Sequence, residues 1–180
     1  VVVGGPAVLN DALLSGSIDF IAAGPPAFIT LWDRTVESVR VMGTAAVAAL
    51  PMYLNTKAAH LQSVDDLRDT DKVGVTAIKV SIPSLVMQMH ARDKYGASQA
   101  TRFDKNTVAI THPDGVVALL SGSNAITAHF TSPPFHQRER KDPQVRTIMT
   151  SDEVMGGATT FVMLSTTARF RDENPAVYRA

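Results

Sequence analysis

Short β-branched runs alternate along the chain with segments whose apolar residues recur at helical spacing. The runs that predict strands are VVV, IDFIAA, VRVMGTA, LPMYLN, KVGVTA, TVAIT, AITAHF, VRTIMT and TTFVMLS. Between them the spacing predicts helices over 6–15, from 25, over 63–69, over about 81–95, from Pro113 and through HQRERKD. The 81–95 segment has Ser81 at its start and Gly96 as its stop, and Ser63 and Asp66 have capping-box spacing. Strands alternating with helices predict an α/β fold with largely parallel sheets.

One hexapeptide, ALLSGS, occurs twice, at Ala12–Ser17 and at Ala118–Ser123. Each copy is followed by an apolar run and a Pro-Pro pair, in AAGPP and in AHFTSPP. Helix, glycine stop, strand and turn is half of a βαβ winding, and open α/β sheets bind ligands at the carboxyl ends of their strands. We therefore expect one such unit in each of two lobes, with the Pro-Pro turns beside a ligand cleft between the lobes. The alternative is that a good helix-ending sequence arose twice by chance.

Composition and charge exclude several classes of function. Seventeen basic residues balance seventeen acidic ones, so no positive field attracts nucleic acid or a membrane surface. The chain has no cysteine, which excludes disulfides, thiolate metal sites and cysteine nucleophiles. Its histidines show no metal-ligand spacing, and neither a nucleophile elbow nor a complete nucleotide-binding loop is present. We therefore expect no catalytic residue, no metal and no cofactor.

The stretch TAIKVSIPS carries the most specific local chemistry. A strand ends here and a helix begins, with Ser81 as N-cap and Lys79 and Val80 just before it. The start of a helix has unpaired N–H groups and a partial positive charge, so this turn can hold an anionic group. The alternative is that Ser81 only caps its helix.

The remaining candidate ligand residues lie at strand ends or in turns: Gly4, Gly5, Gly24, Pro25, Met52, Tyr53, His129, Phe130, Gly156 and Gly157. Tyr53 offers a hydroxyl beside an apolar wall, although it is equally placed for the core. His129 ends an apolar strand, where it either contacts a ligand or is a satisfied buried histidine. The pair Gly156 and Gly157 is either a hinge between lobes or a surface turn.

Three blocks, taken in order, cover nearly the whole chain and resemble a known family. They are LNDALLSGSIDFIAAGPPAF, SVDDLRDTDKVGV and FRDENPAVYRA. They are similar to blocks of the substrate-binding proteins of ABC importers in the nitrate, sulfonate, taurine and thiamine-precursor group. The resemblance implies a two-lobe type II periplasmic binding fold, with lobe 1 over 1–70 plus 155–180, lobe 2 over 71–154, and crossings near Asp71 and near Gly156. It also implies a small-molecule ligand, a membrane permease as partner, and a periplasmic or lipid-anchored location.

The chain departs from the family pattern in three places. The strand and helix that normally precede VVV and the helices that normally follow ENPAVYRA are absent, and Thr70 or Asp71 replaces a family glycine. We expect the missing ends to leave apolar surface on the lobe with Val1–Val3, which predicts self-association or an incomplete sheet edge there. Two other functions stay open, namely the effector-sensing domain of a LysR-type regulator and a pyrimidine synthase on the same fold. The cysteine-rich motif of that synthase cannot exist in this chain.

Overall fold

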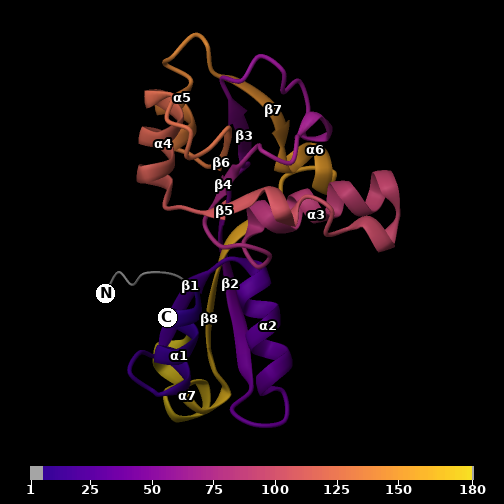
Figure 1. Cartoon of the computed structure of the whole chain (residues 1–180). Helices are drawn as coiled ribbons and strands as arrows, with labels where there is room; N and C mark the ends of the chain where they lie inside the picture. The colour runs from indigo at the N-terminus through magenta and orange to yellow at the C-terminus, as the bar shows by residue number, and fades with distance from the viewer. Residues whose placement is uncertain (1–5, 180) are drawn as a thin grey trace. The chain divides into compact units, whose positions relative to one another are not determined.

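The strands form two sheets, one in each of two units of the chain (Figure 1). The computed structural model describes residues 6–179. Unit 1 combines the chain up to Ala49 with the chain from Thr160, and unit 2 is Leu50–Thr159. The predicted strand Val1–Val3 and the candidates Gly4 and Gly5 lie outside the described residues.

Unit 1 contains a three-stranded sheet in the order β1-β8-β2, in which both pairings are antiparallel. Its elements are α1 (Pro6–Leu14), β1 (Phe20–Ala23), α2 (Pro25–Thr35), β2 (Val41–Ala49), β8 (Thr160–Thr167), α7 (Ala168–Glu173) and α8 (Pro175–Arg179). The core of this unit joins Leu13 of α1 and Leu31 of α2 to Ile21 and Val41 of the sheet. Each of these four side chains is almost fully buried, so the two helices are held to the sheet by apolar contact.

Unit 2 contains a five-stranded sheet in the order β5-β4-β6-β3-β7. Its strands are β3 (Tyr53–Thr56), β4 (Val73–Val75), β5 (Thr107–Ala109), β6 (Ala128–Thr131) and β7 (Arg146–Thr150). Its helices are α3 (Ile82–Tyr95), α4 (His112–Ser121), α5 (Phe135–Glu139) and α6 (Ser151–Met155), with short 3-10 turns η1 (Val64–Asp66), η2 (Ala97–Gln99) and η3 (Asp104–Asn106). Figure 1 shows α4 and α5 on one side of these strands and α3 and α6 on the other.

The α/β fold class is confirmed, but the strand directions are more mixed than the alternation predicted. β4 runs parallel to β5 and to β6, whereas β3 is antiparallel to β6 and β7. The two long connections through α3 and α4 produce the parallel pairs, because each contains a crossover helix. Strands β3 and β7 come from segments on either side of these crossovers. The hydrophobic pattern of a buried strand does not record its direction.

The two ALLSGS copies form the same local unit, as predicted. The first ends α1 and the second ends α4, and the glycine of each copy is left-handed, with φ of 73° at Gly16 and 67° at Gly122. A left-handed residue after a helix favours glycine because other residues meet a steric penalty from Cβ. Each copy then leads through a strand into a Pro-Pro pair, at Pro25 and at Pro133. That both Pro-Pro turns line a ligand site stays a prediction.

The boundary between the units differs from the expected one at its first crossing. Residues 50–70 belong to unit 2, because β3 is an inner strand paired on both sides and its residues Leu54, Asn55 and Thr56 are fully buried. The chain therefore passes between the units at Ala49–Leu50, and returns at Thr159–Thr160, close to Gly157. Within residues 6–179, no helix combines the length and the apolar character needed to cross a membrane.

Candidate functional site

The carboxyl edge of the unit 2 sheet gathers strand ends and helix starts in one place. The parallel strands β4, β5 and β6 end there. β3 begins and β7 ends at the same edge, because Tyr53 pairs with both Thr131 and Thr150. Helices α3 and α4 start from this edge, with Ser81 and Thr111 as their N-caps. Two helix N-termini therefore direct partial positive charge toward one edge, as at ligand sites of open α/β sheets.

Ser81 is engaged within its own turn. Its hydroxyl donates to the carbonyl of Ala77 at 2.7 Å and accepts from the backbone N–H of Ser84 at 3.5 Å. The residue is 7% exposed. The structure therefore gives Ser81 the capping role that the sequence left as the alternative. Beside it, Lys79 and Val80 are exposed, and Lys79 has a φ of 69°.

Tyr53 lies at the beginning of β3 on this edge. Its ring stacks on that of His136, with centroids 3.7 Å apart and planes 16° apart. Its side chain is partly exposed, and its hydroxyl makes no hydrogen bond within residues 6–179. Met52, expected as an apolar wall, is 1% exposed and belongs to the core. The N–H of Met52 donates to Ser151 Oγ at 2.9 Å, which fixes the start of β3 against the start of α6.

His129 and Phe130, expected around the body of a ligand, are both fully buried. The Nδ1 atom of His129 lies 2.5 Å from Glu139 Oε1, and its Nε2 lies 3.3 Å from Nδ1 of His112. Gly74 and Gly115 make room for the ring, since a Cβ on Gly115 would lie 2.4 Å from its Nε2 and one on Gly74 would lie 3.4 Å from its Cδ2. Direct ligand contact by His129 or Phe130 is therefore corrected to a core position, because neither side chain reaches solvent.

His129 is the centre of a chain of polar groups inside unit 2. The second carboxylate oxygen of Glu139 accepts from Asn55 Nδ2 at 2.7 Å. Asn55 Oδ1 accepts in turn from Thr147 at 2.7 Å. Asn55, His129 and Glu139 are each fully buried, so these bonds are strong and costly to break. We call His112, His129, Glu139 and Asn55 the buried relay.

His112 connects the buried relay to the carboxyl edge, and sequence reasoning missed this role. It is the first residue of α4, and its ring stacks against that of Phe135 with centroids 5.3 Å apart. Burial lowers the pKa of His112 to about 4, and the charge of the neighbouring His129 adds to the shift. Both of its hydrogen bonds involve Nδ1, its Nε2 makes none within the described residues, and the residue is partly exposed. The signal in the sequence was a histidine directly after a strand, at a helix start.

The other candidates divide between the two units. Gly24 and Pro25 follow β1 in unit 1, where the Gly24 carbonyl accepts from the N–H of Ala27 at 3.1 Å to open α2. Gly156 and Gly157 follow α6, with φ of 79° and 137°. Unit 2 therefore brings Tyr53, Lys79, Val80 and Ser81 to the edge that carries His112. Among the described residues, no group of three or more His, Asp or Glu could hold a metal ion.

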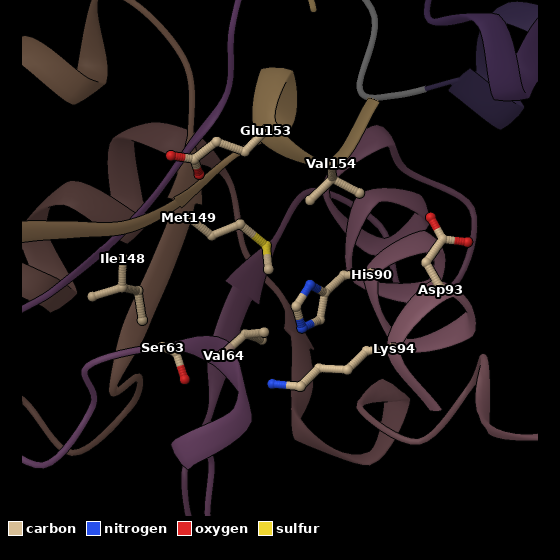
Figure 2. A pocket seen from close by; sticks show the side chains of 9 residues that line it. All are labelled: Ser63, Val64, His90, Asp93, Lys94, Ile148, Met149, Glu153 and Val154. Carbon is tan, nitrogen blue, oxygen red and sulfur yellow. The ribbon is translucent and has the colours of Figure 1, made fainter. Parts of the chain in front are cut away.

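A separate cavity of about 470 Å³ lies in unit 2, lined by η1, α3, β7 and α6 (Figure 2). In Figure 2, His90 and Lys94 extend from α3 toward Val64. Both are bound by Asp65, at 3.1 Å from His90 Nε2 and 2.5 Å from Lys94 Nζ, and Tyr95 donates to the same carboxylate at 2.7 Å. These polar groups are committed to one another and tie η1 to α3. The carboxyl edge is therefore the better candidate site.

The fold can be compared with known proteins. No family model matches the chain, and no curated protein matches it in sequence. Among solved structures, the periplasmic aliphatic sulphonate binding protein SsuA from Escherichia coli is 18% identical, with a TM-score of 0.66 over 98% of this chain and 57% of its own. The alkanesulfonate-binding protein SsuA from Xanthomonas axonopodis pv. citri, bound to MOPS, is 17% identical, with a TM-score of 0.65 over 99% of this chain and 58% of its own.

A third neighbour is a binding protein component of an ABC phosphonate transporter from Pseudomonas aeruginosa. It is 14% identical, with a TM-score of 0.64 over 98% of this chain and 60% of its own. The chain thus spans a little over half the length of these proteins. The similarity to binding proteins of ABC import systems agrees with the resemblance found in the sequence. The chain has the periplasmic-binding-protein fold.

Proposed function

We propose that the protein is the solute-binding receptor of an ABC import system and that it captures a small organic anion. The anion binds at the carboxyl edge of the unit 2 sheet. In this proposal the protein is a binding protein rather than an enzyme, it works outside the cytoplasmic membrane, and a permease receives its ligand.

One observation carries the proposal. At the carboxyl edge, the starts of α3 and α4 lie beside three partly exposed or exposed side chains, each with a polar atom that makes no hydrogen bond within the described residues, namely Tyr53, Lys79 and His112. Helix starts and a lysine ammonium favour a negatively charged group. The exposed Val80, 62% accessible, and the tyrosine ring offer apolar contact to an organic body. A neutral chain has no long-range field to attract an anion, so recognition has to be local.

The comparisons support an anionic ligand with an organic body. The three neighbours are a binding protein for aliphatic sulphonates, one for alkanesulfonates with MOPS bound, and a binding protein component of a phosphonate transporter. All three classes combine a tetrahedral anionic group with an organic body. A ligand of this type fits the donors of the carboxyl edge.

Calorimetric titration tests the proposal with ethanesulfonate, benzoate and uracil as probes. We expect binding of at least one of the two anions and no binding of uracil. Tyr53→Phe and Lys79→Gln should each weaken the bound anion about tenfold, because a hydrogen bond to a charged group contributes about 1.5–3 kcal/mol. Val117→Ala, at a 64% exposed position of α4, is the matched control and should leave affinity unchanged. Tight binding that neither Tyr53→Phe nor Lys79→Gln alters would contradict the proposed site.

Two further roles belong to the proposal. Gly24 and Pro25 occupy the position in unit 1 that Pro133 and its neighbours occupy in unit 2, because the ALLSGS unit precedes both, and we assign them to ligand binding on that basis. Gly156 and Gly157, both with positive φ and close to the crossing at Thr159–Thr160, are assigned to a hinge.

A further inference from the structure

The buried relay contains two histidine rings that face each other through one nitrogen each. Nε2 of His129 and Nδ1 of His112 are 3.3 Å apart, so one hydrogen atom has to lie between them for a bond to form. At the far side of His129, Nδ1 lies 2.5 Å from a carboxylate oxygen of Glu139. The nitrogen that carries hydrogen in one histidine therefore determines which nitrogen carries hydrogen in the other.

Without an additional proton, only one arrangement satisfies both bonds. Glu139 is a carboxylate and accepts from Nδ1–H of His129, whose Nε2 is then a bare acceptor. His112 has to donate to it from Nδ1–H, so its outward Nε2 is an acceptor. The other neutral arrangement, in which Thr131 donates to His112 Nδ1 across 3.4 Å, leaves the buried Nε2 of His129 without a donor. Leaving a buried acceptor unsatisfied costs about 1–3 kcal/mol.

One additional proton reverses the chain. His129 then carries hydrogen on both nitrogens and donates from Nε2 to His112 Nδ1. His112 takes the other tautomer, so its outward Nε2–H becomes a donor. The solvent proton binds His112 Nε2, and the proton on His112 Nδ1 moves to His129 Nε2. The added positive charge therefore resides on His129 beside the Glu139 carboxylate, and His112 itself stays neutral.

We propose that the buried relay takes up one proton when an anion binds at the carboxyl edge, which converts the outward nitrogen of His112 from an acceptor into a donor. This inference rests on the proposed function, since it assumes that the ligand contacts His112. It makes His112 a specificity-determining residue that selects acceptor-bearing anions over neutral donors. It also makes affinity dependent on pH even for a ligand whose own charge is constant.

Few titratable groups surround His129, apart from the members of the buried relay. Its cross-strand neighbours are Gly74 on β4 and Asn55 on β3, neither of which titrates. From α4 it faces His112, and the carboxylate of Asp114 on the same helix accepts from the hydroxyl of the N-cap Thr111 at 2.6 Å. From α5 it faces Glu139. His136 lies beyond Asn55, 3.2 Å from its Nδ2, and burial followed by the charge of Arg140 lowers the pKa of His136.

Glu139→Gln is the decisive variant. Asn55 donates to one oxygen of Glu139, so the glutamine has to place its own oxygen there and its NH₂ toward His129 Nδ1. His129 is then forced into the Nε2–H tautomer without an additional proton, and His112 Nε2–H points outward permanently. The variant therefore keeps the donor and removes the proton uptake.

The experiment uses the full chain, labelled with ¹⁵N, and reads the histidine tautomers by NMR at pH 8 in the absence of ligand. We expect His112 to carry hydrogen on Nδ1 in the wild type and on Nε2 in Glu139→Gln. Calorimetry with ethanesulfonate, which stays ionised, in buffers of different ionisation enthalpy should show uptake of about one proton per bound anion in the wild type and none in Glu139→Gln. His60→Gln, which alters a histidine outside the relay, is the control and should leave the uptake unchanged.

The pH dependence of ethanesulfonate affinity is a second test of the proton uptake. We expect the dissociation constant of ethanesulfonate to rise by up to about tenfold from pH 7 to pH 8 in the wild type, and by less than about twofold in Glu139→Gln. An Nε2–H tautomer of His112 in the free wild type, or binding without proton uptake, would overturn the inference. A failure of ethanesulfonate to bind would count against the proposed function, and the ligand-free NMR comparison would still test the relay.

Discussion

Gly115→Ala is expected to destabilise the protein even though alanine is the better helix former. Gly115 lies in the first turns of α4, and a Cβ there would approach three atoms of the His129 ring, Nε2 at 2.4 Å, Cε1 at 2.5 Å and Cδ2 at 2.8 Å. All three distances are shorter than real Cβ contacts. The ring has little freedom to move away, because it is fully buried and bonded at both nitrogens.

The magnitude follows from two opposing effects. Alanine in place of glycine in a helix interior stabilises by about 1 kcal/mol. Overpacking a tight core costs about 1–3 kcal/mol, and distorting the short bond between His129 and Glu139 adds to that cost. We therefore expect a net loss of about 1–2 kcal/mol in the free energy of unfolding.

Urea unfolding measures this loss as a shift of the midpoint at constant slope. A double-mutant cycle with His129→Asn isolates the contact, since asparagine lacks the two closest ring atoms. In that background Gly115→Ala should cost clearly less or become stabilising. If Gly115→Ala leaves the wild type as stable or more stable, the His129 ring does not pack where the structure places it.

Three other predictions follow from the contacts. Burial opposes the shift, but hydrogen bonds from Lys94, Tyr95 and His90 lower the pKa of Asp65, so Asp65→Asn should reduce the free energy of unfolding in urea at pH 7 by about 1–2 kcal/mol. The stability difference between wild type and variant should disappear as the pH falls below about 4. An unchanged urea midpoint at pH 7 would contradict the hydrogen bonds assigned to Asp65. The pKa of His112 is lowered from 6.5 to about 4, so between these pH values His112 is protonated in the unfolded chain and neutral in the folded one. The free energy of unfolding should therefore fall by up to about 3 kcal/mol as the pH drops from 6.5 to about 4, and this pH dependence should be weaker in His112→Gln. Trp32 is 48% exposed in an apolar stripe on α2, so we predict that the protein self-associates through unit 1 and that Trp32→Glu abolishes the association. A wild-type protein that is monomeric by light scattering at about 100 μM would count against this prediction.

Local signals predicted the elements of this fold well. Helix α3 begins after Ser81 and ends at Gly96 as expected, and the Ser63–Asp66 capping box is present. These features depend on residues near one another in the sequence, where capping hydrogen bonds and left-handed glycines act. The ALLSGS repeat succeeded for the same reason.

The pairing of strands that are far apart in the sequence could not be predicted from such local signals. The position of β3 between β6 and β7 depends on partners 71 or more residues away, such as Thr127 for Thr56, so the unit boundary was expected too late in the chain. The sequence pointed to His129 as a polar residue at the end of an apolar strand, but it could not show that Glu139 is buried next to it. Their pairing requires α5 to fold back over β3 and β6, and only then does His112 become the group that reaches the edge.

Backbone amide NMR shifts, followed during titration with ethanesulfonate, locate the binding site of the anion on the chain. We expect saturable shifts at the carboxyl edge of unit 2, around Tyr53, Lys79 and His112, and weaker binding in Lys79→Gln. Saturable shifts confined to the cavity around His90 and Val154 (Figure 2) would contradict this expectation, as would saturable binding that leaves the amides of the carboxyl edge unmoved.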